Sequence, residues 1–206
     1  MPANNGQQTK SETVNAGETY MNKGWFSIPG VRPGDRTLKE QMIGLQPALD
    51  EAKGKSLLDL GCAEGLIARE FARAGAREVV GIELLAAHLA VAKVQCRDFP
   101  QIKFIWAHLG DYIKSLASFP QYDIVLALGI IHKLHDPVVP MRFAAQSAKR
   151  LVVFRAPAKK YDGLIKSKFT DAKCNVPEVM TSEGFVEERL IAGVRGEACQ
   201  YWRRVK

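Results

Sequence analysis

The sequence of 206 residues is 47% hydrophobic and 25% charged, and it carries a formal net charge of +7 at pH 7. This length suits one α/β domain with a sizeable core and leaves little room for a second domain. No apolar stretch reaches the ~20 residues of a membrane span, no secretory signal is recognisable and no C-x-x-C pair occurs, so we expect a cytoplasmic protein with neither a membrane segment nor a metal site.

The chain begins with a polar segment. Residues 1–22 are rich in Asn, Gln, Thr and Glu, which bury little surface, so we expect a disordered tail there. Residues 23–206 are then expected to form the single domain, with residues 23–54 as its N-terminal cover and first helix. Apolar residues at helical spacing indicate that helix, with Asp35 as its N-cap and a bend near Pro47.

From residue 55 onward, short apolar runs alternate with segments of helical periodicity. The runs are apolar throughout, as strands buried on both faces are. Repeated strand–helix units predict an α/β fold with a doubly wound, mostly parallel seven-stranded sheet and helices on both faces. The final runs, "FVEERLIAG" and "ACQYWRRVK", have no helix between them and predict an antiparallel strand near the C-terminus. The other five predicted strands are Ser56–Leu60, Glu78–Ile82, Ile102–Trp106, Tyr122–Leu128 and Arg150–Arg155.

The positive charge is concentrated in the last quarter of the sequence. Residues 149–206 hold 13 Lys or Arg against 7 Asp or Glu, whereas the rest of the chain is nearly balanced. Such a surplus can attract RNA or another acidic partner, and it can equally be a solvated surface that aids solubility. Both interpretations stay open.

The stretch "LLDLGCAEGLIARE" places a carboxylate and two glycines between a predicted strand and a predicted helix. A dinucleotide turn would need G-x-G-x-x-G, but Ala63 and Leu66 replace its second and third glycines. A phosphate-binding P-loop is excluded because no G-K-[ST] follows. Asp59 at the strand end favours a cationic or hydroxyl-rich ligand. Glu83, at the end of the next predicted strand, could accept hydrogen bonds from the vicinal hydroxyls of a ribose.

Three motifs together resemble one known family. "LLDLGCAEGLIARE", "VVGIELL" and "YDIVLALGIIHKLHDP" are similar, in order and spacing, to successive motifs of the class I S-adenosylmethionine-dependent methyltransferases. The resemblance covers roughly residues 55–157, and "SEGF" at 182–185 is similar to the stretch before the family's last two strands. It implies S-adenosyl-L-methionine as cofactor and S-adenosyl-L-homocysteine as product.

The resemblance also implies roles for individual residues. The loop Gly61–Gly65 would wrap the methionine part, with Asp59 ordering that loop and meeting the amino group. Leu84 would flank the adenine, and His108, or Asp111 in a shifted register, would stand where the family often has an acid. The implied cofactor-binding residues are Asp59, Gly61, Cys62, Ala63, Gly65, Glu83, Leu84, His108, Leu109, Ala127 and Leu128. Arg36, just before the first predicted helix, could also bind there by pairing with the cofactor carboxylate, or it could pair with an acidic substrate.

The catalytic assignment is more open. His132 follows the fourth predicted strand and could act as a general base toward a hydroxyl. The alternative is a loop histidine that only shapes the cleft, because methyl transfer needs mainly in-line positioning.

The expected function is transfer of a methyl group to an O or N atom of an acceptor, with a small molecule favoured over RNA. Methylation of the exocyclic amines of nucleic-acid bases is disfavoured. Enzymes of that kind often carry Asn or Asp before Pro-Pro and an aromatic residue after the fourth strand, where this sequence has "ALGIIHKL". Two alternatives remain: a non-catalytic S-adenosylmethionine-binding module, and a tRNA-modifying enzyme that uses the basic last quarter. The acceptor and the oligomeric state stay open.

Overall fold

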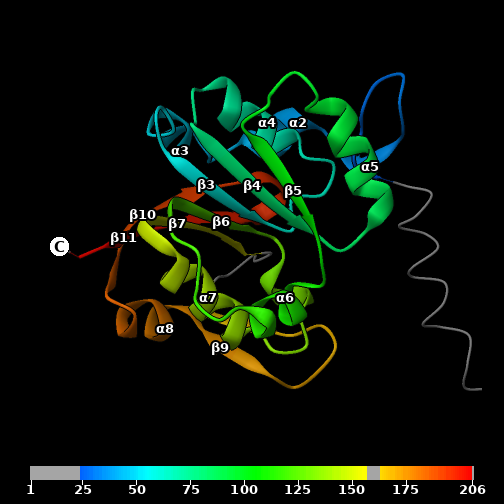
Figure 1. Ribbon diagram of the computed structural model, residues 1–206. Coiled ribbons are helices and arrows are strands. Elements are labelled where there is room, and N and C mark those ends of the chain that lie inside the picture. Colours follow the sequence, from blue (N-terminus) through cyan, green and yellow to red (C-terminus); the bar gives the residue numbers. More distant parts are fainter. Residues whose placement is uncertain (1–23, 157–162, 206) are drawn as a thin grey trace, which may run out of the picture.

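A computed structural model of the chain describes residues 24–156 and 163–205 (Figure 1). The expected tail, residues 1–22, lies outside the described residues. One central sheet contains seven strands in the order β10-β11-β7-β6-β3-β4-β5. The strands are β3 (Ser56–Leu60), β4 (Glu78–Glu83), β5 (Ile102–Trp106), β6 (Tyr122–Leu128), β7 (Ala148–Ala156), β10 (Phe185–Ala192) and β11 (Ala198–Arg204).

The predicted fold class is confirmed. Strands β5, β4, β3, β6 and β7 pair in parallel, whereas β11 runs antiparallel to both of its neighbours, β7 and β10. The antiparallel pair expected at the C-terminus therefore forms one edge of the sheet. All five strands predicted from apolar runs are present, and only β4 and β7 are longer than expected.

Helices cover both faces of the sheet, as Figure 1 shows. Alternate residues of β3 enter the two cores: Leu57 belongs to one apolar cluster, and Leu58 and Leu60 belong to the other. This alternation explains why the whole of β3 is buried and why leucines on both of its faces are apolar core residues. One face carries α2 (Leu38–Met42), α3 (Gln46–Asp50), α4 (Leu66–Arg73) and α5 (Ala86–Gln95), and the other carries α6 (Leu109–Ser115), α7 (Val138–Ser147) and α8 (Val176–Ser182).

The prediction of the first helix was wrong in two respects. Its N-cap is Thr37 rather than Asp35, because Thr37 and Glu40 form a reciprocal capping box. The segment also divides into two short helices at Gly44, whose φ of 81° leaves the helical region. Pro47 does not bend a helix; it lies in the first turn of α3, where its missing N–H costs nothing.

Smaller elements surround the carboxyl ends of the parallel strands. Strands β1 (Gly24–Phe26) and β2 (Gly34–Arg36) pair in parallel before α2, and β8 (Leu164–Lys166) pairs with β9 (Lys173–Asn175) after β7. Two short 3-10 helices are η1 (Ile131–Lys133), which follows β6, and η2 (Val194–Gly196), which connects β10 to β11. Across the part of the chain that the structure describes, no helix is long and apolar enough to cross a membrane.

Candidate functional site

A cavity of about 450 Å³ opens at the carboxyl ends of the parallel strands. This is the edge at which doubly wound sheets bind ligands, and the volume lies in the range of small-molecule sites. Its walls come from β1, from the loops after β3, β4, β5 and β6, and from the loop between β8 and β9. The lining residues are Trp25, Gly61, Ala63, Ile82, Glu83, Leu84, Leu85, His88, Ala107, His108, Leu109, Leu128, Gly129, Ile130, Lys133, Leu134, Lys168 and Phe169.

The loop after β3 reaches the cavity through left-handed backbone. Gly61, Ala63 and Gly65 have φ values of 74°, 47° and 71°. Glycine adopts this conformation freely, whereas the methyl group of Ala63 makes it a strained one. Gly61 and Ala63 line the cavity, while Cys62 and Gly65 do not. The Cys62 side chain is buried instead, so only part of the predicted glycine loop faces the ligand space.

Glu83 is held at the junction of β3 and β4. Its Oε2 accepts a hydrogen bond from the Ala63 backbone N–H at 3.0 Å, and its Oε1 accepts one from the Leu85 N–H at 2.8 Å. The carboxylate is therefore fixed in orientation while it lines the cavity. Because each carboxylate oxygen has two lone pairs, both oxygens can still accept a hydroxyl from a bound ligand.

Asp59 lies at the end of β3 and is almost completely buried. Among the described residues, its Oδ2 has no hydrogen-bond partner. Burial and, to a lesser degree, the nearby Glu83 carboxylate raise the pKa of Asp59 to about 7. Asp59 does not itself line the cavity. An unpaired buried carboxylate oxygen is costly unless a donor, such as a ligand ammonium, approaches it through the neighbouring loop.

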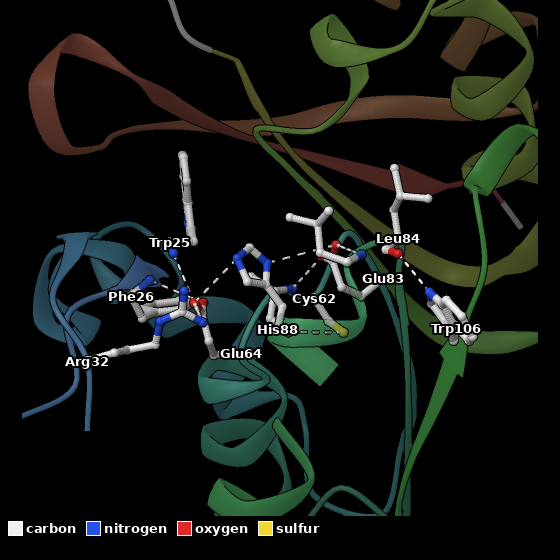
Figure 2. A network of polar contacts seen from close by, with 11 residues as sticks. Trp25, Phe26, Arg32, Cys62, Glu64, Glu83, Leu84, His88 and Trp106 are labelled. Carbon is white, nitrogen blue, oxygen red and sulfur yellow. Dashed lines mark hydrogen bonds and ion pairs between the residues drawn. The ribbon is translucent and has the colours of Figure 1, made fainter. Parts of the chain in front are cut away.

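Figure 2 shows a second polar network beside the loop, centred on Glu64. This carboxylate is fully buried and accepts hydrogen bonds from the backbone N–H groups of Trp25 and Phe26, at 2.9 and 3.1 Å. Arg32 lies 3.4 Å from the same oxygen that Trp25 reaches. Glu64 thus attaches β1 to the glycine loop, a role that the sequence analysis did not foresee.

His88 stands between two carboxylates in the same view. Its Nε2 lies 3.6 Å from Glu64, and its Nδ1 lies 3.9 Å from Glu83. The ring is buried, lines the cavity and has no hydrogen bond within the described residues. Because the two carboxylates come from separate loops, no sequence motif marks this imidazole.

The residues predicted to surround an adenine lie together at one side of the cavity. Leu84, His108 and Leu109 all line it. The Leu84 backbone oxygen accepts a hydrogen bond from the Trp106 indole N–H at 2.8 Å, which fixes the end of β4 against the end of β5. Asp111, the alternative to His108, lies 3.3 Å from the His108 imidazole and does not line the cavity.

Of three other residues predicted to bind the cofactor, only one lines the cavity. Leu128 lines the cavity, whereas Ala127 is buried in the core behind it. Arg36 forms an ion pair with Glu197 at 2.7 Å and packs against the Trp25 indole, so it stands behind the cavity wall.

His132, the predicted general base, is buried and is absent from the cavity lining. Burial and, after it, the charges of Lys168 and Lys133 lower the pKa of His132 to about 4. A neutral imidazole of such low basicity is a weak proton acceptor. The position of His132 therefore does not favour a role as general base. The role of His132 stays a prediction.

Much of the positive charge in the last quarter is used within the molecule. Arg203 forms ion pairs with Glu51 at 2.6 Å and with Glu188 at 2.7 Å. Arg155 is buried and donates to the backbone oxygens of Gln41 and Ile43, at 2.8 and 3.0 Å. Two of the lysines, at positions 159 and 160, lie outside the described residues. Binding of RNA by this surface stays a prediction.

Comparison with known proteins agrees with this arrangement. Residues 57–152 match the family model of a methyltransferase domain. The predicted resemblance to methyltransferases is confirmed over this range, which is slightly less than half of the chain. The matched range begins in β3 and ends in β7, so it spans the glycine loop, the end of β4 and the end of β6.

Solved structures of methyltransferases share the fold of this chain. Magnesium protoporphyrin IX methyltransferase from Synechocystis PCC 6803 with bound SAM aligns over 97% of this chain and 100% of that one, with a TM-score of 0.62 and 18% identity. An S-adenosylmethionine-dependent methyltransferase from Mesorhizobium loti aligns over 78% and 98%, with a TM-score of 0.58 and 18% identity. At these identities the likeness shows the fold alone.

Curated relatives match part of the chain. The ubiquinone biosynthesis O-methyltransferase of Proteus mirabilis is 27% identical over 128 residues, which cover 61% of this chain and 51% of that protein. The enzyme of the same name from Escherichia coli is 31% identical over 97 residues, covering 47% and 39%. The chain therefore spans about half or less of the length of these relatives.

Proposed function

We propose that this protein is an enzyme that transfers a methyl group from S-adenosyl-L-methionine to an oxygen or nitrogen atom of a small acceptor. The observation that carries the proposal is the pairing of two strand ends: Glu83 receives the Ala63 N–H at 3.0 Å while the neighbouring buried Asp59 keeps an unpaired oxygen. The methyltransferase domain match and the S-adenosylmethionine-dependent neighbours support it.

The residues present fit such a ligand. Glu83 would accept the two ribose hydroxyls, since both of its oxygens keep free lone pairs in the cavity. Leu84, His108 and Leu109 would hold the adenine between apolar walls. The carboxylate of Asp59 would compensate an ammonium at the loop, in line with its buried unpaired oxygen.

When bound, the sulfonium supplies an electrophilic methyl group. The chain's own contribution is to hold the acceptor in line with that methyl group and to exclude water. Leu128, Gly129 and Ile130, at and after the end of β6, line the same cavity as Trp25 and Lys133 and would help to position the acceptor. As the new bond to the acceptor forms, the bond between the methyl carbon and sulfur would break, with S-adenosylhomocysteine as the leaving group. An acceptor of low pKa has released its proton to solvent before it binds, so this step needs no protein base.

An oxygen acceptor is favoured because the curated relatives are named O-methyltransferases. A non-catalytic binding module is the second candidate, because His132 is buried away from the cavity lining and is a weak base. Turnover with any acceptor would exclude this second candidate.

The test combines binding with turnover. Calorimetry with S-adenosylhomocysteine should show micromolar or tighter binding that Glu83→Gln weakens by at least tenfold, whereas Glu78→Gln, at the exposed start of β4, should leave it unchanged. Incubation with S-adenosylmethionine labelled at its methyl carbon and fractionated cell extract should then label a small molecule. Absence of both binding and label would refute the proposal, and binding without label would identify the non-catalytic module.

A further inference from the structure

The cavity wall holds one carboxylate and two lysines. The carboxylate is Glu83, whereas the nearby Asp59 is buried and does not line the cavity. The lysines are Lys133, from η1, and Lys168, from the loop between β8 and β9. Among the described residues, no carboxylate forms an ion pair with either lysine.

The fold holds these two lysines close together in spite of their like charge. The Lys168 backbone N–H donates to the His132 oxygen at 2.9 Å, and the Ser167 hydroxyl donates to the Leu134 oxygen at 2.7 Å. These bonds attach the β8–β9 loop to both sides of Lys133. Burial and, after it, the charge of Lys168 lower the pKa of Lys133. Lys133 is partly buried and Lys168 is exposed, and the charge of Glu83 offsets part of the effect on Lys133. An anion bound between the two lysines would reduce their mutual repulsion further.

An aromatic wall accompanies the two lysines. The Lys133 ammonium lies 4.1 Å from the centre of the Trp25 ring, and the Arg36 guanidinium lies 5.3 Å from the same ring. The indole is partly buried and lines the cavity, and one buried nitrogen of Arg36, Nη1, has no partner among the described residues. Phe169, 62% exposed, stands at the rim beside Lys168.

We propose, on the basis of the function proposed above, that the methyl acceptor carries a carboxylate or phosphate group that binds between Lys133 and Lys168, with its adjoining planar or apolar part against Trp25. The cofactor's single carboxylate can neutralise at most one of these lysines. The bound sulfonium adds another positive charge facing the acceptor. An anionic acceptor compensates both effects, whereas a neutral acceptor would leave the lysines unpaired.

The test compares matched probes on the protein saturated with S-adenosylhomocysteine. Calorimetry should show that benzoate or phenyl phosphate binds at least tenfold more tightly than its neutral counterpart, benzamide or phenol. The two anions separate a carboxylate site from a phosphate site. Lys133→Gln and Lys168→Gln should each weaken binding of the preferred anion by at least fivefold. The control is Lys103→Gln, which should leave binding unchanged because Lys103, on β5, is exposed and pairs with Glu78 on β4.

Three results would overturn the inference. Equal binding of benzoate and benzamide and of phenyl phosphate and phenol would show that charge is not recognised. Unchanged anion binding in both lysine variants would place the anion elsewhere. A tenfold loss of S-adenosylhomocysteine affinity in Lys168→Gln would assign the lysines to the cofactor carboxylate.

If S-adenosylhomocysteine does not bind the wild-type protein, the proposed function fails first, and the same probe pairs on the free protein then decide whether the anion site exists. Lys168 is exposed, so its variant stays folded and informative even if Lys133→Gln does not.

Discussion

The Glu64 carboxylate accepts the Trp25 backbone N–H at 2.9 Å, and this hydrogen bond joins the turn after β3 to the strand that forms one wall of the cavity. The residues are separated by 38 intervening positions, and the bond is shielded from water because Glu64 is fully buried. The loop predicted to hold a cofactor and the wall predicted to face an acceptor are therefore one connected unit.

Replacing Glu64 with Ala should destabilise the protein. The change leaves the Trp25 and Phe26 N–H groups without an acceptor and removes the ion pair with Arg32. We expect a loss of roughly 2–4 kcal/mol in the free energy of unfolding. Urea denaturation measures it, and Glu78→Gln, which removes an exposed ion pair with Lys103, should cost less than about 1 kcal/mol. Equal losses in the two variants would contradict the role of Glu64.

Replacing Ala63 with Gly should not destabilise the protein, although the position is buried. With a φ of 47°, Ala63 is in the left-handed region, where a Cβ costs roughly 1–2 kcal/mol that glycine avoids. Loss of the methyl packing and the greater freedom of the unfolded chain offset part of this gain. The matched control is Ala68→Gly in α4, where normal helical geometry predicts a loss of roughly 1 kcal/mol. Thermal melts of both variants decide: a loss at position 63 as large as at position 68 would show that the strain is absent.

Affinity for S-adenosylhomocysteine should increase as the pH rises through about 7. The raised pKa of Asp59, about 7, keeps the carboxyl protonated in weakly acidic solution, and only the ionised form can pair with a ligand ammonium. Between pH 5.5 and 7 we expect the dissociation constant to fall by up to about tenfold per pH unit. Asp59→Asn should bind more weakly at pH 8 and should show a flatter profile. The same pH dependence in wild type and Asp59→Asn would assign the effect to another group.

The stability of the free protein should depend on pH through two opposing groups. The pKa of His132 is lowered to about 4, so its buried neutral form resists protonation and stability is lost as pH falls from 6.5 toward 4. The pKa of Asp59 is raised to about 7, so its contribution is lost as pH rises from about 4 toward 7.

Single variants separate these two contributions. Asp59→Asn should be stabilised by rising pH across this window, because the His132 contribution remains. His132→Gln should show the opposite slope, because the Asp59 contribution remains. Urea midpoints measured at half-unit steps from pH 4 to 7.5 test both slopes, and parallel profiles in the two variants would show that neither pKa is shifted in the stated direction.

The sequence by itself determined the sheet and the end of it that binds ligands. Apolar runs such as Ser56–Leu60 and Tyr122–Leu128 are buried on both faces, and this burial restricts their composition strongly enough to mark both strands to the residue. The glycine loop and Glu83 follow such strands directly, so their place at one edge follows from local order along the chain.

Only the tertiary structure decided which polar groups meet across that edge. His88, in α5, lies between Glu64 and Glu83, and Lys168 lies beside Lys133 although 34 residues intervene between them. It also showed that His132, which resembled a base in the sequence, is buried away from the cavity lining. The physical reason is that the burial and charge environment of a side chain depend on what packs against it in three dimensions, and strand and helix periodicity carry no record of those contacts.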